Sequence, residues 1–308
     1  MAAIAIALAV VIDLLFGDPP NRWHPVAWMG RLLEGGRRRL GHGPPRALLV
    51  RGALVVVACT ALAGLVGWVV SSLAARWGIG GVLIEAMALK MSISLRDLAM
   101  AGRDVSRALR GGDLTEARRL VGYHLVSRPT SNLDGGQVAS AAIESAAENL
   151  TDAFAAPLLS YLLFGLAGAY AYRAVNTADA MFGYRDGDLE YFGKACARLD
   201  DILNLIPARI AALSIVGCAV FTGADAGGSW RTMRGDHRRT ASPNAGWTMS
   251  AMAGALGVVL EKPGAYRLGA GRRPEPGDIA RAARLMLWGA TGMTVAALGW
   301  LLLRSYWG

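Results

Sequence analysis

The sequence predicts an all-α protein: a polytopic helical membrane protein with about five or six hydrophobic segments and amphipathic cytoplasmic helices. Of its 308 residues, 54% are hydrophobic and only 18% are charged, which is unusual for a soluble protein. Several long stretches carry no charged residue, and no stretch alternates polar and apolar residues as a strand would. Because backbone polar groups in lipid must be satisfied within the protein, helices are the expected spanning elements.

The clearest hydrophobic segment covers residues 52–75, which contain no charge and exceed the roughly 20 residues that an α-helix needs to cross a bilayer. Residues 2–16 lack the basic start and small-residue cleavage site of a signal peptide, so a short membrane or packed helix is expected there. Comparable segments are 153–172, 205–224, 240–260 and 285–303, the second of them interrupted by Arg209.

The net charge of +9 indicates anionic lipid headgroups and phosphorylated ligands rather than nucleic acid, because the arginines are spread over connectors beside apolar segments. The connector between the first two segments contains Asp18 and Glu34 as its only acids. Its arginines are Arg22, Arg31, Arg37, Arg38, Arg39, Arg46 and Arg51. The positive-inside rule therefore places this connector in the cytoplasm, and we expect a multi-pass protein of the cytoplasmic (inner) membrane with a site that faces the cytoplasm.

The longest polar stretch, residues 76–152, predicts long amphipathic helices that stop at the Gly111-Gly112 pair. Asp113 is expected to cap a further helix, with Glu116 as its capping-box partner. Residues 127–136 have turn composition. No repeat or linker divides the chain, so residues 1–308 are expected to form a single integral-membrane domain.

The segment IESAAENLTD places Glu144, Glu148 and Asp152 at intervals of four residues, on one face of a helix. Like charges at this spacing repel by about 0.2–0.5 kcal/mol per pair, so the row favours a bound cation. Mg²⁺ that holds nucleotide phosphates is the candidate, because it prefers carboxylates together with substrate oxygens. The alternative is a solvent-facing row paired with arginines.

Two further polar clusters flank apolar segments. In YRAVNTADAMFGY, Tyr172, Asn176 and Asp179 share a helix face beside Arg173, and the alternative interpretation is an ordinary polar helix end. In ARLDDILNLIPARI, the residues near one face are Arg198, Asp201 and Asn204, with Asp200 beside them. Ionisable residues so close to a membrane segment are candidates for function.

The remaining candidates lie near the two ends of the chain. SPNAGW, which contains Asn244, opens an uncharged helix whose first amides are an anion-binding candidate, or else a packing surface of small residues. Asp18 and His24 follow the first apolar segment, and a histidine before Pro25 is more often a turn residue than a base. The three cysteines form no CxxC pair, and no Walker A, GxGxxG, HExxH or GxSxG motif occurs.

Six segments in this order resemble the CbiB/CobD family: DLLFGDPPNRWHPVAWMG, SRPTSNLD, IESAAENLTD, YRAVNTADAMFGY, FGKACARLDDILNLIPAR, and SPNAGW with AMAGALGV. The similarity covers nearly the whole chain. Pro129 and Thr248-Met249 replace residues that carry a carboxylate in the family's pattern, and Ala153 replaces a frequent glycine. Roles of the family's acids at Pro129 and Thr248-Met249 therefore do not transfer.

The resemblance implies an adenosylcobinamide-phosphate synthase of cobalamin (vitamin B12) biosynthesis. Such an enzyme is an ATP-dependent ligase that forms an amide between adenosylcobyric acid and (R)-1-aminopropan-2-ol O-phosphate or a related amino alcohol. The expected cofactors are ATP and Mg²⁺; the expected partners are the two small-molecule substrates and membrane lipid, with no nucleic acid, and a homo-oligomer or association with other cobalamin-assembly enzymes is an open expectation.

The resemblance and the polar clusters together assign the site residues. The catalytic candidates are Glu144, Glu148 and Asp179, and the metal candidates are Glu144, Glu148 and Asp152. The candidates for binding substrate or nucleotide are Asp18, His24, Arg128, Asn149, Arg173, Asn176, Arg198, Asp201, Asn204 and Asn244. Among these, Arg128, Arg173 and Arg198 are assigned to phosphates, and Asn176 and Asp179 to the metal or the amine.

A single bilayer crossing by residues 153–172 would put the motifs before and after it on opposite faces. Pro157, Gly165 and Gly168 weaken that helix, so we expect a re-entrant or broken segment, or a site sunk into the membrane. Two alternatives remain open from the residues alone. One is a Mg²⁺-dependent membrane prenyltransferase-like enzyme, and the other is a transporter, which would show acids at mid-span and paired repeats.

Overall fold

The computed structural model describes residues 1–307 and is helical over most of its length, as the sequence predicts. Contacts gather the residues into two compact units, each built from several stretches of the chain. Unit 1 comprises Met1–Ser94, Ala156–Asn204 and the described residues from Ala297 on; unit 2 comprises Leu95–Ala155 and Leu205–Ala296. The predicted single domain over 1–308 stays a prediction.

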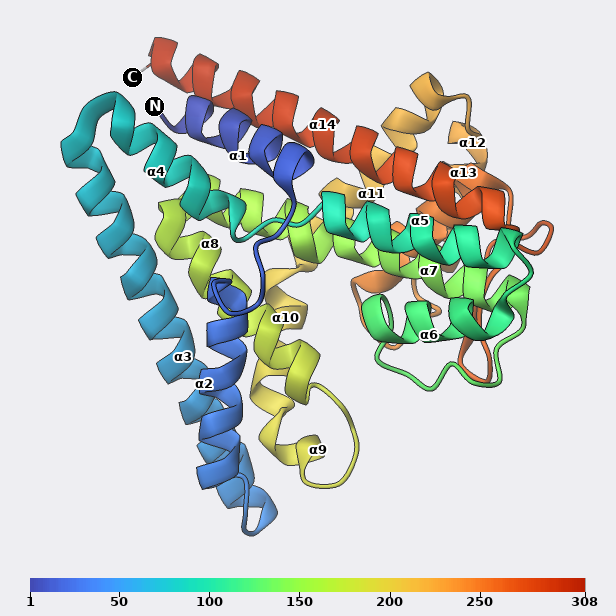
Figure 1. Cartoon of the computed structure of the whole chain (residues 1–308), viewed down its shortest axis with the longest axis horizontal. Coiled ribbons are helices and arrows are strands. Elements are labelled where there is room, and N and C mark those ends of the chain that lie inside the picture. Colours follow the sequence, from blue (N-terminus) through green and yellow to red (C-terminus); the bar gives the residue numbers. More distant parts are fainter. Residues whose placement is uncertain (308) are drawn as a thin grey trace. The chain divides into compact units, whose positions relative to one another are not determined.

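Unit 1 is a bundle around the long helix α3, which packs against α8 and α4, while α1 packs on α4 (Figure 1). Its elements are α1 (Ala2–Phe16), α2 (Pro25–Leu40), α3 (Pro45–Ala74), the 3₁₀ turn η1 (Ala75–Trp77), α4 (Gly78–Lys90), α8 (Ala156–Phe182), α9 (Leu189–Phe192) and α10 (Lys194–Leu203). α3 and α8 approach closely at Gly67, where a β-carbon would lie 2.6 Å from the Leu166 carbonyl oxygen.

Helix α8 is broken at Gly165, whose φ of 63° and ψ of −159° are not helical. A β-carbon at Gly168 would lie 2.5 Å from the Ser160 carbonyl oxygen, although eight residues of straight helix separate two positions by about 12 Å. The chain therefore reverses inside α8. The predicted broken segment within 153–172 is confirmed, and an unbroken crossing by these residues does not form.

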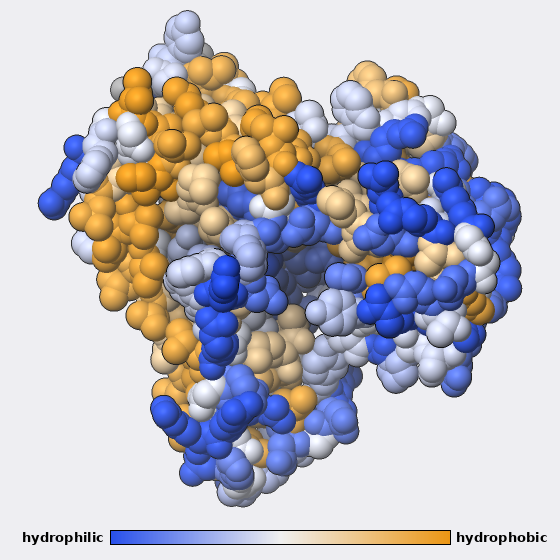
Figure 2. Space-filling model, in the orientation of Figure 1, coloured by the Kyte–Doolittle hydropathy of each residue, from blue (hydrophilic) through white to orange (hydrophobic). Residues whose placement is uncertain are grey.

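Four helical segments are long and apolar enough to cross a membrane: Pro45–Lys90, Gly135–Phe182, Leu205–Thr222 and Pro276–Tyr306. The reversal at Gly165 divides the second of them. Exposed apolar side chains line α3, including Leu54 at 60% and Trp68 at 61% exposure, and Figure 2 shows apolar surface gathered over α3 and α4. Such a surface suits lipid contact, and it supports the polytopic prediction.

The expected hydrophobic segment 240–260 is corrected by the structure. It forms α13 (Ala245–Leu256), whose 12 residues span about 18 Å, well short of the roughly 30 Å hydrocarbon core. Nearly all of its residues are buried, so α13 is a core helix of unit 2. Apolar composition without polar alternation is shared by spans and buried helices, and length alone distinguishes them.

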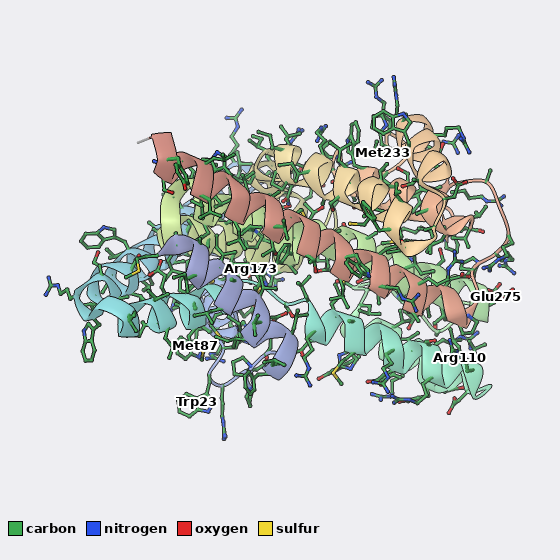
Figure 3. The ribbon with its side chains drawn as sticks, turned by 90° about the horizontal axis from the view of Figure 1, so that it is seen from above. Trp23, Met87, Arg110, Arg173, Met233 and Glu275 are labelled. Carbon is green, nitrogen blue, oxygen red and sulfur yellow. The ribbon has the colours of Figure 1, made fainter. Side chains whose placement is uncertain are left out.

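Unit 2 packs α13 against α12, α11 and α7. Its elements are α5 (Arg96–Arg110), α6 (Leu114–His124), α7 (Gly135–Leu150), the π-helical turn η2 (Thr151–Ala155), α11 (Leu205–Thr222), α12 (Ala226–Asp236), α13, β1 (Leu260–Lys262) and β2 (Tyr266–Leu268); α14 (Pro276–Trp307) contributes residues to both units. Figure 3 labels Arg110 and Glu275 at the ends of α5 and α14, where Ser106 donates a 2.6 Å hydrogen bond to the Pro276 carbonyl.

The local signals that were predicted for unit 2 are mostly present. α5 ends before Gly111, and the Asp113 side chain caps α6 by accepting a hydrogen bond from the Glu116 amide. The Glu116 carboxylate pairs with Arg119 at 2.7 Å instead of completing a capping box. A complete capping box, formed by Asp134 and Gln137, starts α7 and was missed.

The antiparallel hairpin β1–β2, in which Lys262 pairs with Tyr266, was not predicted from the sequence. Each strand has three residues, too few to show alternation.

Candidate functional site

Glu144 is the centre of a polar cluster in unit 2. It lies on α7 with 4% of its surface exposed, although helix interiors rarely bury an acid without partners. Its carboxylate accepts hydrogen bonds from Ser140 at 2.8 Å and Tyr266 at 3.0 Å, and Arg128 Nη2 lies 3.3 Å away. The site therefore holds one buried acid, one guanidinium and two hydroxyls.

The β1–β2 hairpin positions two of these groups. Ser140 Oγ accepts a 2.7 Å hydrogen bond from the Glu261 amide, which ties β1 to α7 one turn before Glu144. Tyr266, on β2, reaches the carboxylate directly. Burial, and then the neighbouring Glu144 carboxylate, raise the pKa of Tyr266, so its hydroxyl stays protonated and remains a donor.

Arg128 approaches Glu144 from the turn that precedes α7. Its Nε is buried and has no hydrogen-bond partner among the described residues, while its Nη2 faces Glu144. A buried donor without an acceptor is unfavourable by about 1–3 kcal/mol, and an oxygen of an anionic ligand would satisfy it.

The acidic row is interrupted after its second member. Glu148 lies one turn after Glu144 on α7 and is exposed, whereas Asp152 falls in the wider π-helical turn η2, beyond the end of α7. Within residues 1–307, no three His, Cys, Asp or Glu side chains are grouped as a metal ion would require. The predicted set of three carboxylates is therefore not assembled, because a π turn does not keep the four-residue spacing of an α-helix.

The predicted ligand Asn149 is directed back to its own helix. Its side-chain amide donates to the Ser145 carbonyl at 3.0 Å and to Ser145 Oγ at 3.2 Å. Both acceptors lie one turn earlier on α7, so Asn149 stabilises its own helix in this structure.

Asp200 is the centre of a second polar network, which lies in unit 1. Asn204 donates to it at 2.9 Å and Asn176 at 3.3 Å. Tyr172 donates to Asn204 Oδ1 at 2.9 Å, and Arg173 Nη1 donates to Asn176 Oδ1 at 3.1 Å. Helical spacing predicts that these residues lie near one another, but the predicted site residue was Asp201, which is half-buried, instead of the buried Asp200.

The burial of Asp200 sets its charge behaviour. Desolvation raises its pKa, as does repulsion from Asp201, while the hydrogen bonds from Asn176 and Asn204 oppose the shift. Asp179 lies one turn after Asn176 and is half-buried. Arg198, which was assigned to phosphates, is exposed on α10, and no described contact brings it into the Asp200 network.

A third network in unit 1 joins α1, the following turn and α4. Lys90 is fully buried and pairs with Asp18 and, at 3.4 Å, with Asp13. Ser94 donates to Asp18 at 2.8 Å, and His24 Nε2 lies 3.6 Å from Asp18. Burial alone would raise the pKa of Asp18, but the bonds from His24 and Lys90 outweigh it and hold that pKa well below its usual range.

His24 is a helix cap in this structure. Its Nδ1 accepts the Val26 amide at 3.2 Å, which leaves Nε2 as the nitrogen that faces Asp18. Neighbouring Trp23, in contrast, projects away from the helices and is 62% exposed (Figure 3). Lys90 was missed, although an ionisable residue inside an apolar run is the signal that identifies such a residue.

Asn244 is buried at the start of α13 in unit 2. Its side-chain oxygen accepts from Arg209 at 3.3 Å, and its backbone N–H donates to Ser242 Oγ at 3.2 Å. Arg209 also lies over the Trp247 ring, 4.7 Å from its centroid. These contacts give Asn244 a structural role at the helix start.

The predicted site residues are thus divided between the units. Unit 2 contains Arg128, Glu144, Glu148, Asn149, Asp152 and Asn244, and unit 1 contains Asp18, His24, Arg173, Asn176, Asp179, Arg198, Asp201 and Asn204. The Glu144 cluster combines a buried acid with a buried guanidinium donor that has no hydrogen-bond partner among the described residues, so it is a candidate for binding a charged ligand.

Comparison with known proteins agrees with the sequence resemblance. Residues 6–286 match the family described as CobD/Cbib protein. The cobalamin biosynthesis protein CobD of Dehalococcoides mccartyi (strain CBDB1) is 43% identical over 268 residues, which cover 87% of this chain and 86% of that protein. The protein of the same name from Klebsiella pneumoniae is 36% identical over 311 residues, 96% of each chain.

A third relative, the cobalamin biosynthesis protein CobD of Chromobacterium violaceum, is 38% identical over 315 residues, covering 96% of this chain and 97% of that protein. No solved structure matches the chain significantly. The family match extends over most of the sequence, and it includes both the Glu144 and the Asp200 networks. The chain therefore belongs to the CobD/CbiB family of cobalamin biosynthesis proteins.

Proposed function

We propose that this protein is an ATP-dependent adenosylcobinamide-phosphate synthase. It joins adenosylcobyric acid to the amine of (R)-1-aminopropan-2-ol O-phosphate or a related amino alcohol. Membership of the CobD/CbiB family supports a role in cobalamin biosynthesis. The structural observation that supports a ligase is the Arg128 guanidinium beside buried Glu144, whose buried Nε has no hydrogen-bond partner among the described residues.

The proposed reaction proceeds in two balanced steps. A propionate oxygen of adenosylcobyric acid attacks the γ-phosphorus of ATP, which forms an acyl phosphate and breaks the bond to ADP. The amine nitrogen then attacks the acyl carbon, forms the C–N bond, and releases inorganic phosphate and a proton. Activation is needed because a carboxylate is a poor electrophile for an amine.

The Glu144 cluster suits the charge changes in these steps. Arg128 offers donors to phosphate oxygens, and Tyr266, whose raised pKa keeps its proton in place, offers a neutral donor beside the carboxylate. Glu144 is the proton acceptor that we assign to the amine. Glu148, exposed one turn away, is assigned to the Mg²⁺-bound nucleotide.

Mg²⁺ would need only one or two carboxylates from this cluster. It is usually bound through one or two carboxylates together with phosphate oxygens and water, so Glu148 satisfies its chemistry without a set of three acids. Glu144 stays bonded to Arg128, Ser140 and Tyr266. When bound, Mg²⁺ would neutralise phosphate charge during transfer. The seven arginines between residues 17 and 51 favour a cytoplasmic orientation in the inner membrane, where ATP is present.

A reconstituted assay tests the proposal. The full chain, purified in detergent, is incubated with adenosylcobyric acid, ATP, Mg²⁺ and either the phosphorylated or the free amino alcohol, and the products are identified by mass spectrometry. We expect an amide product that requires every component, with one ADP released per amide formed. Product without ATP turnover, or none with any amine, would contradict a ligase.

Substitution of Arg128 connects the activity to the site. Arg128→Lys keeps the charge but loses the planar fork and its Nε donor, so we expect at least a tenfold loss of kcat. Arg119→Lys is the matched control, because Arg119 is exposed and pairs only locally with Glu116. A prenyltransferase-like enzyme would show no ATP turnover in the same assay, and no specific contact favours that alternative or a transporter.

A further inference from the structure

Unit 1 contains a pocket of about 310 Å³ that belongs to none of the three polar networks. It lies among α1, α3, α4 and α8. Small residues form much of its wall, including Ala5, Ala74 and Gly78, and its polar lining is provided by Ser71, Glu85 and Tyr161. The pocket is therefore mostly apolar, with one acid on its wall.

The Glu85 carboxylate has an asymmetric environment. Ser71 Oγ donates to Oε1 at 3.0 Å and the Tyr161 hydroxyl donates to the same oxygen at 3.3 Å. No described residue donates to Oε2, and no Lys, Arg or His nitrogen or N-terminal amine of the described chain lies within 4.0 Å of this carboxylate. One oxygen is thus stabilised by the protein, and the other is open.

An acid without a cation is unfavourable at this position. Glu85 is half-buried on α4, inside a segment apolar enough to cross a membrane, and its helix neighbours Val82 and Ala86 are buried. An ionisable side chain in such a segment normally has a paired charge. Both hydroxyl donors are used by Oε1, so the group that this carboxylate lacks is a cation at Oε2.

The kind of cation follows from the donor set. A divalent metal takes about six oxygen ligands, usually from several carboxylates, and this pocket offers a single carboxylate. A primary ammonium group needs fewer partners, because it is a compact charge whose three hydrogens can each find an acceptor. The small apolar residues leave room for the carbon atoms attached to it.

We propose that this pocket binds a primary ammonium group, with Glu85 Oε2 as its acceptor. The ligand is either the headgroup of an aminophospholipid or a small free amine. Exposed apolar residues at the adjoining helix ends, Trp77 at 70% and Ile79 at 88%, would place the pocket beside lipid. The proposal concerns binding only, and it does not depend on the ligase reaction.

Two arms of one experiment distinguish the sources. In the first, the detergent-purified full chain is incubated with phosphatidylethanolamine, phosphatidylcholine or phosphatidylglycerol, and retained lipid is counted by native mass spectrometry. In the second, ethanolamine is titrated calorimetrically into the chain in phosphatidylglycerol nanodiscs. Retention of phosphatidylethanolamine over the other two lipids identifies the headgroup, and saturable ethanolamine binding identifies the free amine.

Glu85→Gln keeps the shape of the side chain and an acceptor for Ser71 and Tyr161, but it removes the charge. We expect at least a tenfold weaker affinity in whichever arm shows binding, since a charge-assisted hydrogen bond contributes more than a neutral one. Glu190→Gln is the matched control: it makes the same chemical change on α9, where Glu190 pairs with Lys194 at 3.4 Å.

A second variant, Ala75→Leu, tests the pocket independently in case Glu85→Gln does not fold. Ala75 is exposed and lines the pocket, so Ala75→Leu should fill it without touching Glu85. We expect this variant to keep the wild-type melting temperature and to lose ammonium binding. Binding that is equal in wild type, Glu85→Gln and Ala75→Leu, no binding in either arm, or equal retention of phosphatidylcholine would overturn the proposal.

Discussion

Tyr266 donates a 3.0 Å hydrogen bond to Glu144, which lies 122 residues earlier in the chain. This bond joins the β1–β2 hairpin to the buried acid on α7, and Ser140 reinforces the connection by accepting from the Glu261 amide. The hairpin is thus the element that completes the Glu144 cluster. Its contribution to activity can be measured by a substitution that removes one hydroxyl group.

Tyr266→Phe removes only the hydroxyl. A hydrogen bond to a charged group contributes about 1.5–3 kcal/mol, so we expect kcat of the proposed ligation to fall at least tenfold. The KM for ATP should change less, because the donor faces the carboxylate rather than the nucleotide. The control is Tyr184→Phe, whose hydroxyl bonds to the Ala180 carbonyl at 3.1 Å on an exposed surface. Equal losses in both variants would count against a role for Tyr266.

Glu148→Gln tests the exposed member of the acidic row. Because Glu148 is exposed, the substitution should leave the protein folded and extractable from the membrane with an unchanged melting temperature. We expect ligation to be abolished if Glu148 holds the Mg²⁺-bound nucleotide. The measurement is amide formation at saturating ATP and increasing Mg²⁺, and full activity would remove Glu148 from the site.

Lys90→Met removes the cation that faces both Asp13 and Asp18. Breaking a buried ion pair by deleting one partner typically destabilises a protein by about 3–5 kcal/mol, and we expect a loss in this range in chemical unfolding. Lys194→Met is the control, because its pair with Glu190 is exposed and should contribute about 1 kcal/mol or less. Similar losses for the two variants would show that the Lys90 network is not a major source of stability.

The sequence alone predicts those parts of the fold that depend on local chemistry. Helical spacing placed Glu144 and Glu148 on one helix, turn composition predicted the irregular stretch before α7, and Pro157, Gly165 and Gly168 indicated the break in α8. Each of these signals involves residues within a few turns of one another, for which backbone geometry fixes the outcome.

The partners of the site residues were not predictable in this way. Glu144 is bonded by Tyr266, and Asp18 pairs with Lys90, 72 residues away. Such contacts depend on tertiary packing, which a single sequence does not specify. The choice of Asp200 over Asp201 likewise depends on which of two adjacent acids faces the interior.

Asp200 predicts a pH dependence of stability. Its pKa in the folded protein is raised above the usual 3.8, chiefly by burial, so the folded state retains this proton where the unfolded chain has released it. The stabilisation is full below the unfolded pKa and is lost as pH rises through the folded pKa. We expect the melting temperature to decline as pH rises from the unfolded pKa through the folded pKa, more steeply in the wild type than in Asp200→Asn. Parallel pH profiles would exclude Asp200 as the source.

Gly165→Ala tests the reversal in α8. The backbone angles of Gly165, φ 63° and ψ −159°, lie in a region that is nearly confined to glycine, so a β-carbon should destabilise the protein by about 1–3 kcal/mol. Gly217→Ala is the control, because Gly217 lies in α11 with no atom within 4 Å of an added β-carbon, and alanine favours a helix by up to about 1 kcal/mol.

The same two variants also show whether the reversal in α8 contributes to activity as well as to stability. The reversal sets the direction of the second arm of α8, which carries Tyr172, Arg173 and Asn176 into the Asp200 network. We therefore expect Gly165→Ala to lower ligation more than its loss of stability explains, measured well below its melting temperature, while Gly217→Ala keeps full activity. If Gly165→Ala retains wild-type stability, α8 can continue as an unbroken helix, and the two arms need not fold back on each other.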